Sequence, residues 1–146
     1  MTHAEQEGMA PALDISAWIN TAPLSLSQLR GKVVIIHAFQ MLCPGCVTHG
    51  IPQASAIYEL YKNEDLQVIG LHSVFEHHQV MTKEALSVFI SEYGIRFPVA
   101  IDTPSESRSM PKTMTLYQMR GAPTLIMLDK QGRVRLHHFG HMRDRK

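Results

Sequence analysis

Residues 39–53 read FQMLCPGCVTHGIPQ and hold both cysteines of the chain, Cys43 and Cys46. The pair follows an apolar, β-branched run at residues 33–36, which predicts a buried strand. Where such a strand ends in Cys-x-x-Cys and a helix begins, the first thiol lies at the helix N-terminus, and unpaired N–H groups and the helix dipole favour its thiolate. The stretch therefore predicts Cys43 as a nucleophile, with Cys46 one turn later to close a disulfide.

Two other uses of the cysteine pair agree less well with the sequence. A structural zinc site needs about four ligands. The chain has no second Cys pair, and His49 has no partner at His-x3–5-His spacing. An inert structural disulfide across two residues would close too short a loop to remove much entropy from the unfolded chain. The sequence favours redox chemistry over both.

The composition suits one compact domain, with 146 residues and 45% hydrophobic content. Fourteen basic and thirteen acidic residues give a net charge of +1, without a basic run interleaved with aromatics, so we expect no nucleic-acid partner. We expect a disordered segment at residues 1–12 and a single domain at residues 13–146.

No stretch approaches the roughly 18 apolar residues of a membrane span, and residues 1–11 lack the apolar core of a signal peptide. We therefore expect no membrane span and a cytoplasmic location for the chain as given. A signal sequence or anchor ahead of residue 1 would make the location periplasmic or membrane-bound.

Periodicity and turn residues predict the order of elements. Pro52 falls inside a predicted helix and should kink it. The order predicts an α/β core, with a central mixed sheet flanked by helices, a parallel part and a closing antiparallel hairpin. We expect a short strand or turn at 13–20, strands at 33–38, 66–71, 97–101, 125–128 and 134–139, helices at 24–32, 47–62, 82–93 and around 113–119, and a hairpin turn at 129–132.

With the CPGC motif of residues 43–46 at the first strand-to-helix junction, the chain resembles the thioredoxin fold, and more closely the TlpA/ResA-like (redoxin) branch of thiol-disulfide oxidoreductases. Three further segments resemble that branch: LSQLRGK at 26–32, YGIRFPV at 93–99, and GAPT at 121–124, which is similar to its cis-proline loop. The resemblance runs from about residue 13 to residue 140. It implies an oxidoreductase of cell redox homeostasis that needs no cofactor and exchanges disulfides with protein partners.

The resemblance also implies roles for the residues around the pair. The Cys43 thiolate attacks a partner disulfide, and Cys46 then resolves the mixed disulfide. Pro123 is expected to be cis and to hold the Ala122 backbone beside Cys43 as a short β-type surface for the substrate chain. An ordinary trans turn proline is the alternative. The residues expected to shape the site are Leu42, Pro44, Gly45, Ala122 and Pro123.

The chain departs from the family pattern in three ways. Leu42 replaces the aromatic residue that usually precedes the first Cys, which predicts an aliphatic rim. Only six residues follow Gly140, so we expect the final helix to be missing and a sheet face to be open or covered by a partner chain, as in a homodimer. His37 and His49 stand where thioredoxins and the ResA-like branch, respectively, hold a buried acid.

These two histidines are candidates for a proton relay. His49 is preferred, because it follows Cys46 by about one helical turn and can share its face. Each histidine also has a structural interpretation, as a hydrogen-bonded core residue for His37 and a solvent-facing residue for His49.

Two rival functions belong to other classes. A peroxiredoxin-related thiol peroxidase needs a Pro-x-x-x-Thr-x-x-Cys loop, which does not precede Cys43. A copper- or zinc-binding protein of the SCO type carries a Cys-x-x-x-Cys motif. The spacing between Cys43 and Cys46 is one residue shorter. We predict no metal site, because the remaining histidines lack carboxylates at fixed spacing. An electron-donating reductase is a further expected partner.

Overall fold

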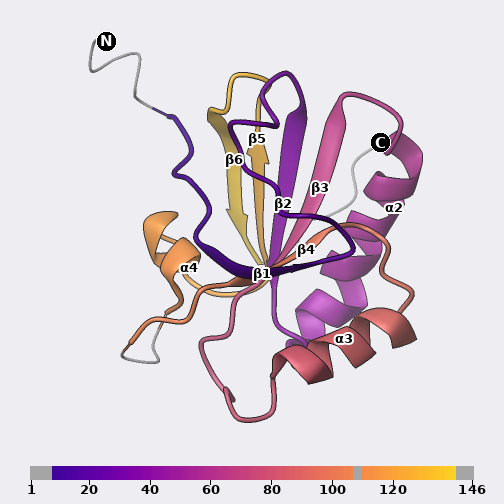
Figure 1. Ribbon diagram of the computed structural model, residues 1–146, viewed down its shortest axis with the longest axis vertical. Helices are drawn as coiled ribbons and strands as arrows, with labels where there is room; N and C mark the ends of the chain where they lie inside the picture. The colour runs from indigo at the N-terminus through magenta and orange to yellow at the C-terminus, as the bar shows by residue number, and fades with distance from the viewer. Residues whose placement is uncertain (1–7, 107–109, 141–146) are drawn as a thin grey trace.

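The computed structural model describes residues 8–106 and 110–140. They form a six-stranded sheet in the order β1-β4-β3-β2-β5-β6 (Figure 1). The strands are β1 Ile15–Ile19, β2 Val33–Phe39, β3 Leu66–His72, β4 Val99–Asp102, β5 Thr124–Leu128 and β6 Val134–Phe139. The helical elements are the π-helical turn η1 Cys46–Gly50 and the α-helices α2 Ile51–Tyr61, α3 Lys83–Glu92 and α4 Lys112–Leu116.

The sheet is mixed, as predicted. β2, β3 and β4 are parallel neighbours, whereas β5 pairs antiparallel with β2, β6 with β5 and β1 with β4. The β2–β3 register runs from Val33 opposite Leu66 to Phe39 opposite His72. The C-terminal ends of the two central strands therefore meet at one end of the sheet, and Cys43 follows there.

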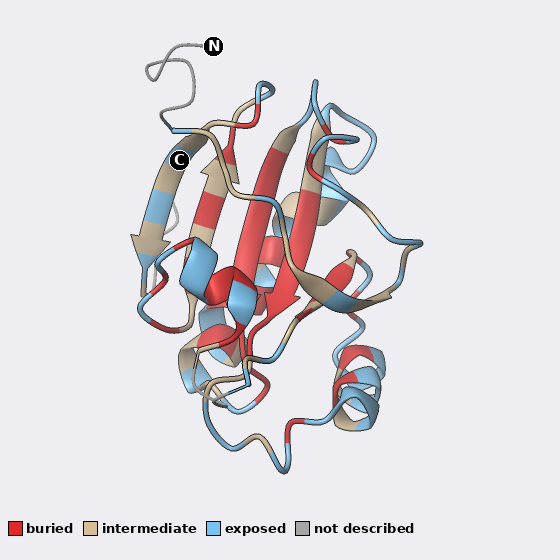
Figure 2. Cartoon of the chain, turned by 60° about the vertical axis from the view of Figure 1, so that its left-hand side comes forward, coloured by how far each residue is buried: buried red, intermediate tan, exposed pale blue. Residues whose placement is uncertain are grey.

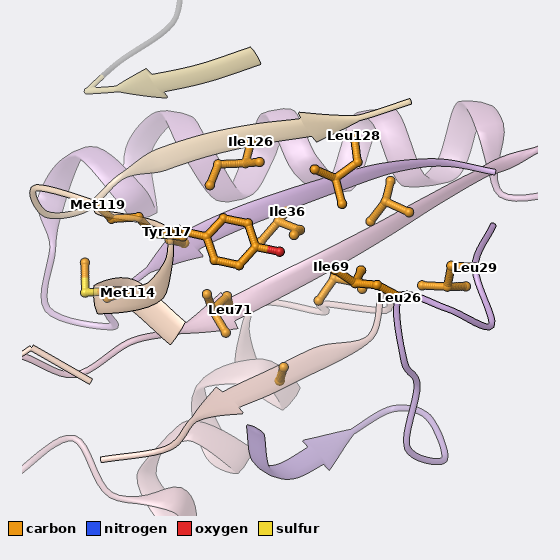
Figure 3. Close-up of a cluster of buried hydrophobic side chains, with 13 residues drawn as sticks. Leu26, Leu29, Ile36, Ile69, Leu71, Met114, Tyr117, Met119, Ile126 and Leu128 are labelled. Carbon is orange, nitrogen blue, oxygen red and sulfur yellow. The ribbon is translucent and has the colours of Figure 1, made fainter. Parts of the chain in front are cut away.

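Alternation along β2 separates two buried clusters, because successive side chains of a strand point to opposite faces. Ile36 belongs to the cluster drawn in Figure 3, which packs against Met114 of α4 and Tyr117 just after it. Phe39 belongs to the second cluster, which includes residues of α2 and α3. Figure 1 shows α4 on one side of the sheet and α2 and α3 on the other. Burial is densest along the central strands, whereas the edge strand β6 alternates between half-buried and exposed (Figure 2).

The prediction of a helix at residues 24–32 is wrong. Residues 26–31 form consecutive turns instead, with hydrogen bonds from Gln28 N to Ser25 O and from Leu29 N to Leu26 O. The hydroxyl of Ser25 also accepts a hydrogen bond from Gln28 N, and such local bonds compete with helix formation. Leu26 and Leu29 are buried all the same, as their apolar spacing predicts.

The helix expected at residues 47–62 is present, but it has two parts. Ile51 N donates to Cys46 O, five residues back, which makes the first turn π-helical. Pro52 then falls in the first turn of α2, directly after the π-helical turn. The proline therefore lies at the junction between the two helix types, and the kink expected there stays a prediction.

The segment expected to be disordered, residues 1–12, is described only from residue 8. Ala10 N donates to Gly132 O, and Tyr117 Oη donates to Pro11 O. The described part therefore lies along the β5–β6 hairpin and beside α4, because its backbone groups find partners there. Residues 1–7 lie outside the described residues, and the expected disordered segment at 1–12 and the single domain at 13–146 stay predictions.

Within the described chain, no helix follows β6, and none is long and apolar enough to cross a membrane. Leu125, Met127 and Leu136 are half-buried. Strand alternation places them on the α2 side of β5 and β6, the face that the final helix would cover. The homodimer that we expected to cover this face stays a prediction.

Candidate active site

The turn after β2 presents the first cysteine at the start of a helix. Cys43 N donates to Gln40 O, which closes the turn, and Val47 N donates to Cys43 O, which opens the first helical turn. The helical backbone begins at Pro44. Cys43 thus occupies the helix N-terminus that the sequence predicts for the nucleophile.

The two thiols differ in environment. Cys43 is half-buried, Cys46 is fully buried, and both are free. The backbone N–H of Cys46 donates to Cys43 Sγ at 3.3 Å. Burial raises the pKa of the Cys46 thiol far above its usual range, and its hydrogen bond with Cys43 raises it further. Cys46 is therefore a protonated thiol at neutral pH, next to an accessible sulfur that already accepts a hydrogen bond.

The loop before β5 forms the other wall of the site. The Ala122–Pro123 peptide is cis, as the resemblance implies. The Cys43 thiol donates to Ala122 O at 3.6 Å, and a Cβ on Gly45 would lie 3.6 Å from Pro123 Cδ. Ala122, Pro123 and Gly45 are thus gathered around Cys43.

The rim of the site is open on the side of Leu42, which is 57% exposed, and Pro44 is exposed as well. Leu42 thus gives this rim an aliphatic side chain. Phe139 at the end of β6 adds an exposed aromatic surface near Gly121, because a Cβ on Gly121 would lie 3.1 Å from its ring. Phe139 was not among the residues that we expected to shape the site.

His37 is buried on the α2 side of β2. Its ring stacks beside Phe39 and lies against Gly50, where an added Cβ would fall 2.6 Å from His37 Cε1. Burial lowers the pKa of His37 to about 4, so the ring is neutral at physiological pH. Neither ring nitrogen has a hydrogen-bond partner among the described residues. Among these residues, no protein group therefore holds the His37 ring by a hydrogen bond.

A cavity of about 30 Å³ adjoins this ring, lined by residues that include His37, Gly50, Ala54 and Pro123. A cavity holds a water molecule from about 10–15 Å³ upward. The space beside His37 is thus large enough for one water.

His49 is exposed, whereas Cys46 and Gly50 of the same turn are buried. Cys46 and His49 would share a face only in an α-helix with 3.6 residues per turn. The wider π-helical turn places Gly50, not His49, on the buried side with Cys46. His49 therefore does not share the buried face of Cys46, and its role as a proton relay stays a prediction.

Two buried polar side chains that the sequence did not point to, Gln40 and His72, are 1% and 2% exposed. Met41 N donates to His72 Nε2, and Phe75 N donates to Gln40 Oε1. The available signal was their position, since each stands where an apolar central strand ends beside the cysteine motif.

For residues 8–106 and 110–140, no group of three or more His, Cys, Asp or Glu side chains is arranged to hold a metal ion.

Comparison with known proteins places this geometry in a family. The Redoxin family model matches residues 6–145. A solved thiol-disulfide isomerase from Corynebacterium glutamicum is 52% identical, with a TM-score of 0.91 over 95% of this chain and 90% of that one. A solved thioredoxin-like superfamily protein is 50% identical, with a TM-score of 0.90 over 93% of this chain and 88% of that one.

Two curated relatives are longer proteins. Protein DipZ of Mycobacterium bovis is 34% identical over 93% of this chain, which spans 19% of DipZ. The thiol-disulfide oxidoreductase ResA of Bacillus anthracis is 29% identical over 76% of this chain, and the match spans 57% of ResA.

The fold and site define a thioredoxin-like domain of the TlpA/ResA type. The chain belongs to the Redoxin family.

Proposed function

We propose that this domain exchanges disulfides with protein partners through Cys43 and Cys46. The observation that carries the proposal is the contrast between the two thiols. Cys43 is accessible and accepts the N–H of Cys46, whereas Cys46 is fully buried and its pKa is raised by burial. In such a pair, one thiol can attack a partner disulfide, and the other stays protonated until it resolves the mixed disulfide.

In the reducing direction, the Cys43 thiolate attacks one sulfur of a partner disulfide. A mixed disulfide forms, and the other partner sulfur leaves as a thiolate. Cys46 then loses its proton and attacks Cys43 Sγ, which forms the Cys43–Cys46 disulfide and releases the second partner sulfur as a thiolate that takes up a proton. The partner gains two electrons and the pair loses two, and the oxidising direction is the reverse.

The substrate chain would lie along the cis-proline loop. Ala122 is half-buried beside Cys43 and precedes β5, so its backbone can pair with an extended peptide. Leu42 and Phe139 supply exposed apolar surface at this rim. We propose an extended segment with an apolar side chain next to its cysteine as the preferred substrate.

A reductase must restore the dithiol after each reducing cycle, because the cycle ends with the Cys43–Cys46 disulfide. We propose a second dithiol protein as this electron donor. It would approach the same face, since Cys46 is fully buried and only Cys43 is partly accessible.

We also propose that the two histidines near the pair divide the handling of protons. His37 stays neutral because burial holds its pKa at about 4, and a water in the adjoining cavity would let it pass a proton without keeping a charge. His49 is exposed on the π-helical turn that carries Cys46, and it would supply the pH-dependent part.

The pH dependence of the redox potential tests this division. Between about pH 5 and 8, we expect His49→Ala to alter the curve and His37→Ala to leave its shape unchanged. If neither substitution alters any part of the curve, both histidines are structural. An altered curve in His37→Ala alone would assign the pH-dependent part to His37.

Reduction of insulin by dithiothreitol tests the proposed activity itself. The wild-type chain should accelerate the reaction, and Cys43→Ser should abolish the acceleration. Ser91→Ala, an exposed change on α3, is the matched control and should behave as wild type. A Cys43→Ser variant that works at the wild-type rate would remove the basis of the proposal.

A further inference from the structure

The turn that presents Cys43 is held by buried polar side chains as well as by its own backbone. Gln40 accepts Phe75 N through Oε1 at 3.0 Å and approaches Glu76 Oε1 through Nε2 at 3.5 Å. Its backbone carbonyl accepts Cys43 N. Gln40 therefore joins the cysteine turn to the loop that follows β3.

His72 holds the same turn from the end of β3. Its Nε2 accepts Met41 N at 3.3 Å, in a fully buried contact, and its ring packs on Phe39 with 5.1 Å between ring centres. An imidazole nitrogen that accepts a hydrogen bond carries no proton, so the neutral ring must hold its proton on Nδ1. Burial lowers the pKa of His72 to about 4, which keeps the ring in the neutral form that can accept this bond.

The other side of His72 borders open space. It lines a cavity of about 430 Å³, together with residues of the loop after β3, the start of α3 and β4. The ionisable side chains lining this cavity are His78, Lys83, Asp102 and Glu106. The Asp102 carboxylate is satisfied separately, because it accepts hydrogen bonds from Ser73 Oγ, Thr113 N and Met114 N. The bond to Met41 is thus the hydrogen bond that ties His72 to the redox site.

We propose that His72 is a positioning residue for the nucleophile: its Nε2 fixes the backbone at Met41 and thereby sets where Cys43 lies relative to the Cys46 N–H. The inference rests on the proposed disulfide exchange. Met41 is two residues before Cys43, and the turn is short, so a displaced Met41 N–H moves the sulfur. Loss of the acceptor would leave a buried N–H unpaired and let the turn rearrange to satisfy it.

Two amide substitutions separate the hydrogen bond from simple filling of space. The Oε1 atom of a glutamine can take the place of Nε2, whereas an asparagine reaches only the place of Nδ1. We expect His72→Gln to keep the wild-type rate of Cys43 alkylation and the wild-type redox potential. His72→Asn should slow alkylation by about three- to tenfold, the effect of one net hydrogen bond, and make the pair more reducing.

Ser73→Ala is the matched control, because it removes a buried hydrogen bond one residue away that ends on Asp102 and not on the cysteine turn. It should destabilise the chain and leave alkylation rate and potential unchanged. Equal rates in His72→Gln and His72→Asn would overturn the inference, and so would a Ser73→Ala variant that slows alkylation as much as His72→Asn.

Nitrogen NMR of the wild-type chain gives a test that needs no variant to fold. At neutral pH, His72 should show the neutral tautomer protonated on Nδ1, and Met41 should have a slowly exchanging amide. A ring protonated on Nε2, or a fast-exchanging Met41 amide, would overturn the inference even where insulin reduction still depends on Cys43. Insulin reduction that survives Cys43→Ser would instead overturn the proposed function, with the His72–Met41 bond intact.

Discussion

The ring of His37 lies directly against Gly50, so β2 and the π-helical turn touch where a side chain would otherwise stand. Gly50 is buried in an ordinary helical conformation, and the missing Cβ, not an unusual backbone angle, is what the site requires. The helix carrying Cys46 can approach the sheet this closely only with glycine at this position.

Gly50→Ala should therefore destabilise the fold. The new methyl group would overlap the His37 ring, and such overpacking costs about 1–3 kcal/mol. Urea unfolding would measure it. Gly45→Ala is the control, because a Cβ there meets Pro123 at an ordinary contact distance of 3.6 Å. In the double variant His37→Ala/Gly50→Ala, the cost of the alanine at 50 should largely disappear. A Gly50→Ala variant as stable as wild type would mean that the helix and β2 are farther apart.

Acid should weaken the fold through His37 and His72. Burial lowers the pKa of each to about 4, whereas an unfolded histidine titrates near 6.5. The unfolded chain thus binds more protons as the pH falls from about 6.5 to 4, and the free energy of unfolding should drop by up to about 1.4 kcal/mol per pH unit for each histidine. Above about pH 6.5 both states are neutral and the effect vanishes.

Asp102 acts in the opposite direction as the pH falls, because burial raises its pKa and folding then favours the bound proton. Urea unfolding of wild type and His37→Asn at pH 7, 6 and 5 isolates the contribution of His37, because His72 and Asp102 are present in both proteins. The variant should lose part of the slope between pH 6.5 and 5. A free energy of unfolding that stays constant from pH 7 to 5 would contradict the buried, neutral state of both histidines.

The two thiols should react with alkylating agents at very different rates. Cys43 is half-buried at the rim, whereas Cys46 is fully buried and its pKa is raised by burial. With limiting iodoacetamide on the folded, reduced chain, peptide mass spectrometry should find label on Cys43 and almost none on Cys46. In urea the two should become similar. Equal labelling in the folded chain would show that Cys46 is more accessible than this structure allows.

Much of this architecture could be predicted from the sequence because it depends on local patterns. The β-branched run of β2, the CPGC motif and the GAPT segment placed the redox pair between a central strand, a helix N-terminus and the cis-proline loop. Helix-like apolar spacing was less reliable at residues 24–32, where Leu26 and Leu29 are buried from a series of turns. Apolar spacing predicts which side chains are buried, but it does not show whether a helix or a series of turns carries them.

The remaining features depend on contacts between distant residues. Nothing local in the sequence shows that the turn after Cys46 is π-helical, and this is why His49 was expected on the wrong side of the helix. The His72–Met41 bond joins residues 31 positions apart and exists only because β2 and β3 are parallel and in register. The segment before β1 likewise finds its partners on the β5–β6 hairpin, which no nearby residue indicates.

The central claim is that Cys43 attacks and Cys46 resolves, and trapping of mixed disulfides tests it most directly. Cys46→Ser should accumulate a covalent adduct between Cys43 and a protein carrying an accessible disulfide, such as insulin, because the resolving thiol is gone. Cys43→Ser should form none, since its remaining thiol is fully buried. Non-reducing gels and mass spectrometry of the linked peptides would show both outcomes. Adducts joined through Cys46 in Cys43→Ser, with none in Cys46→Ser, would contradict the account.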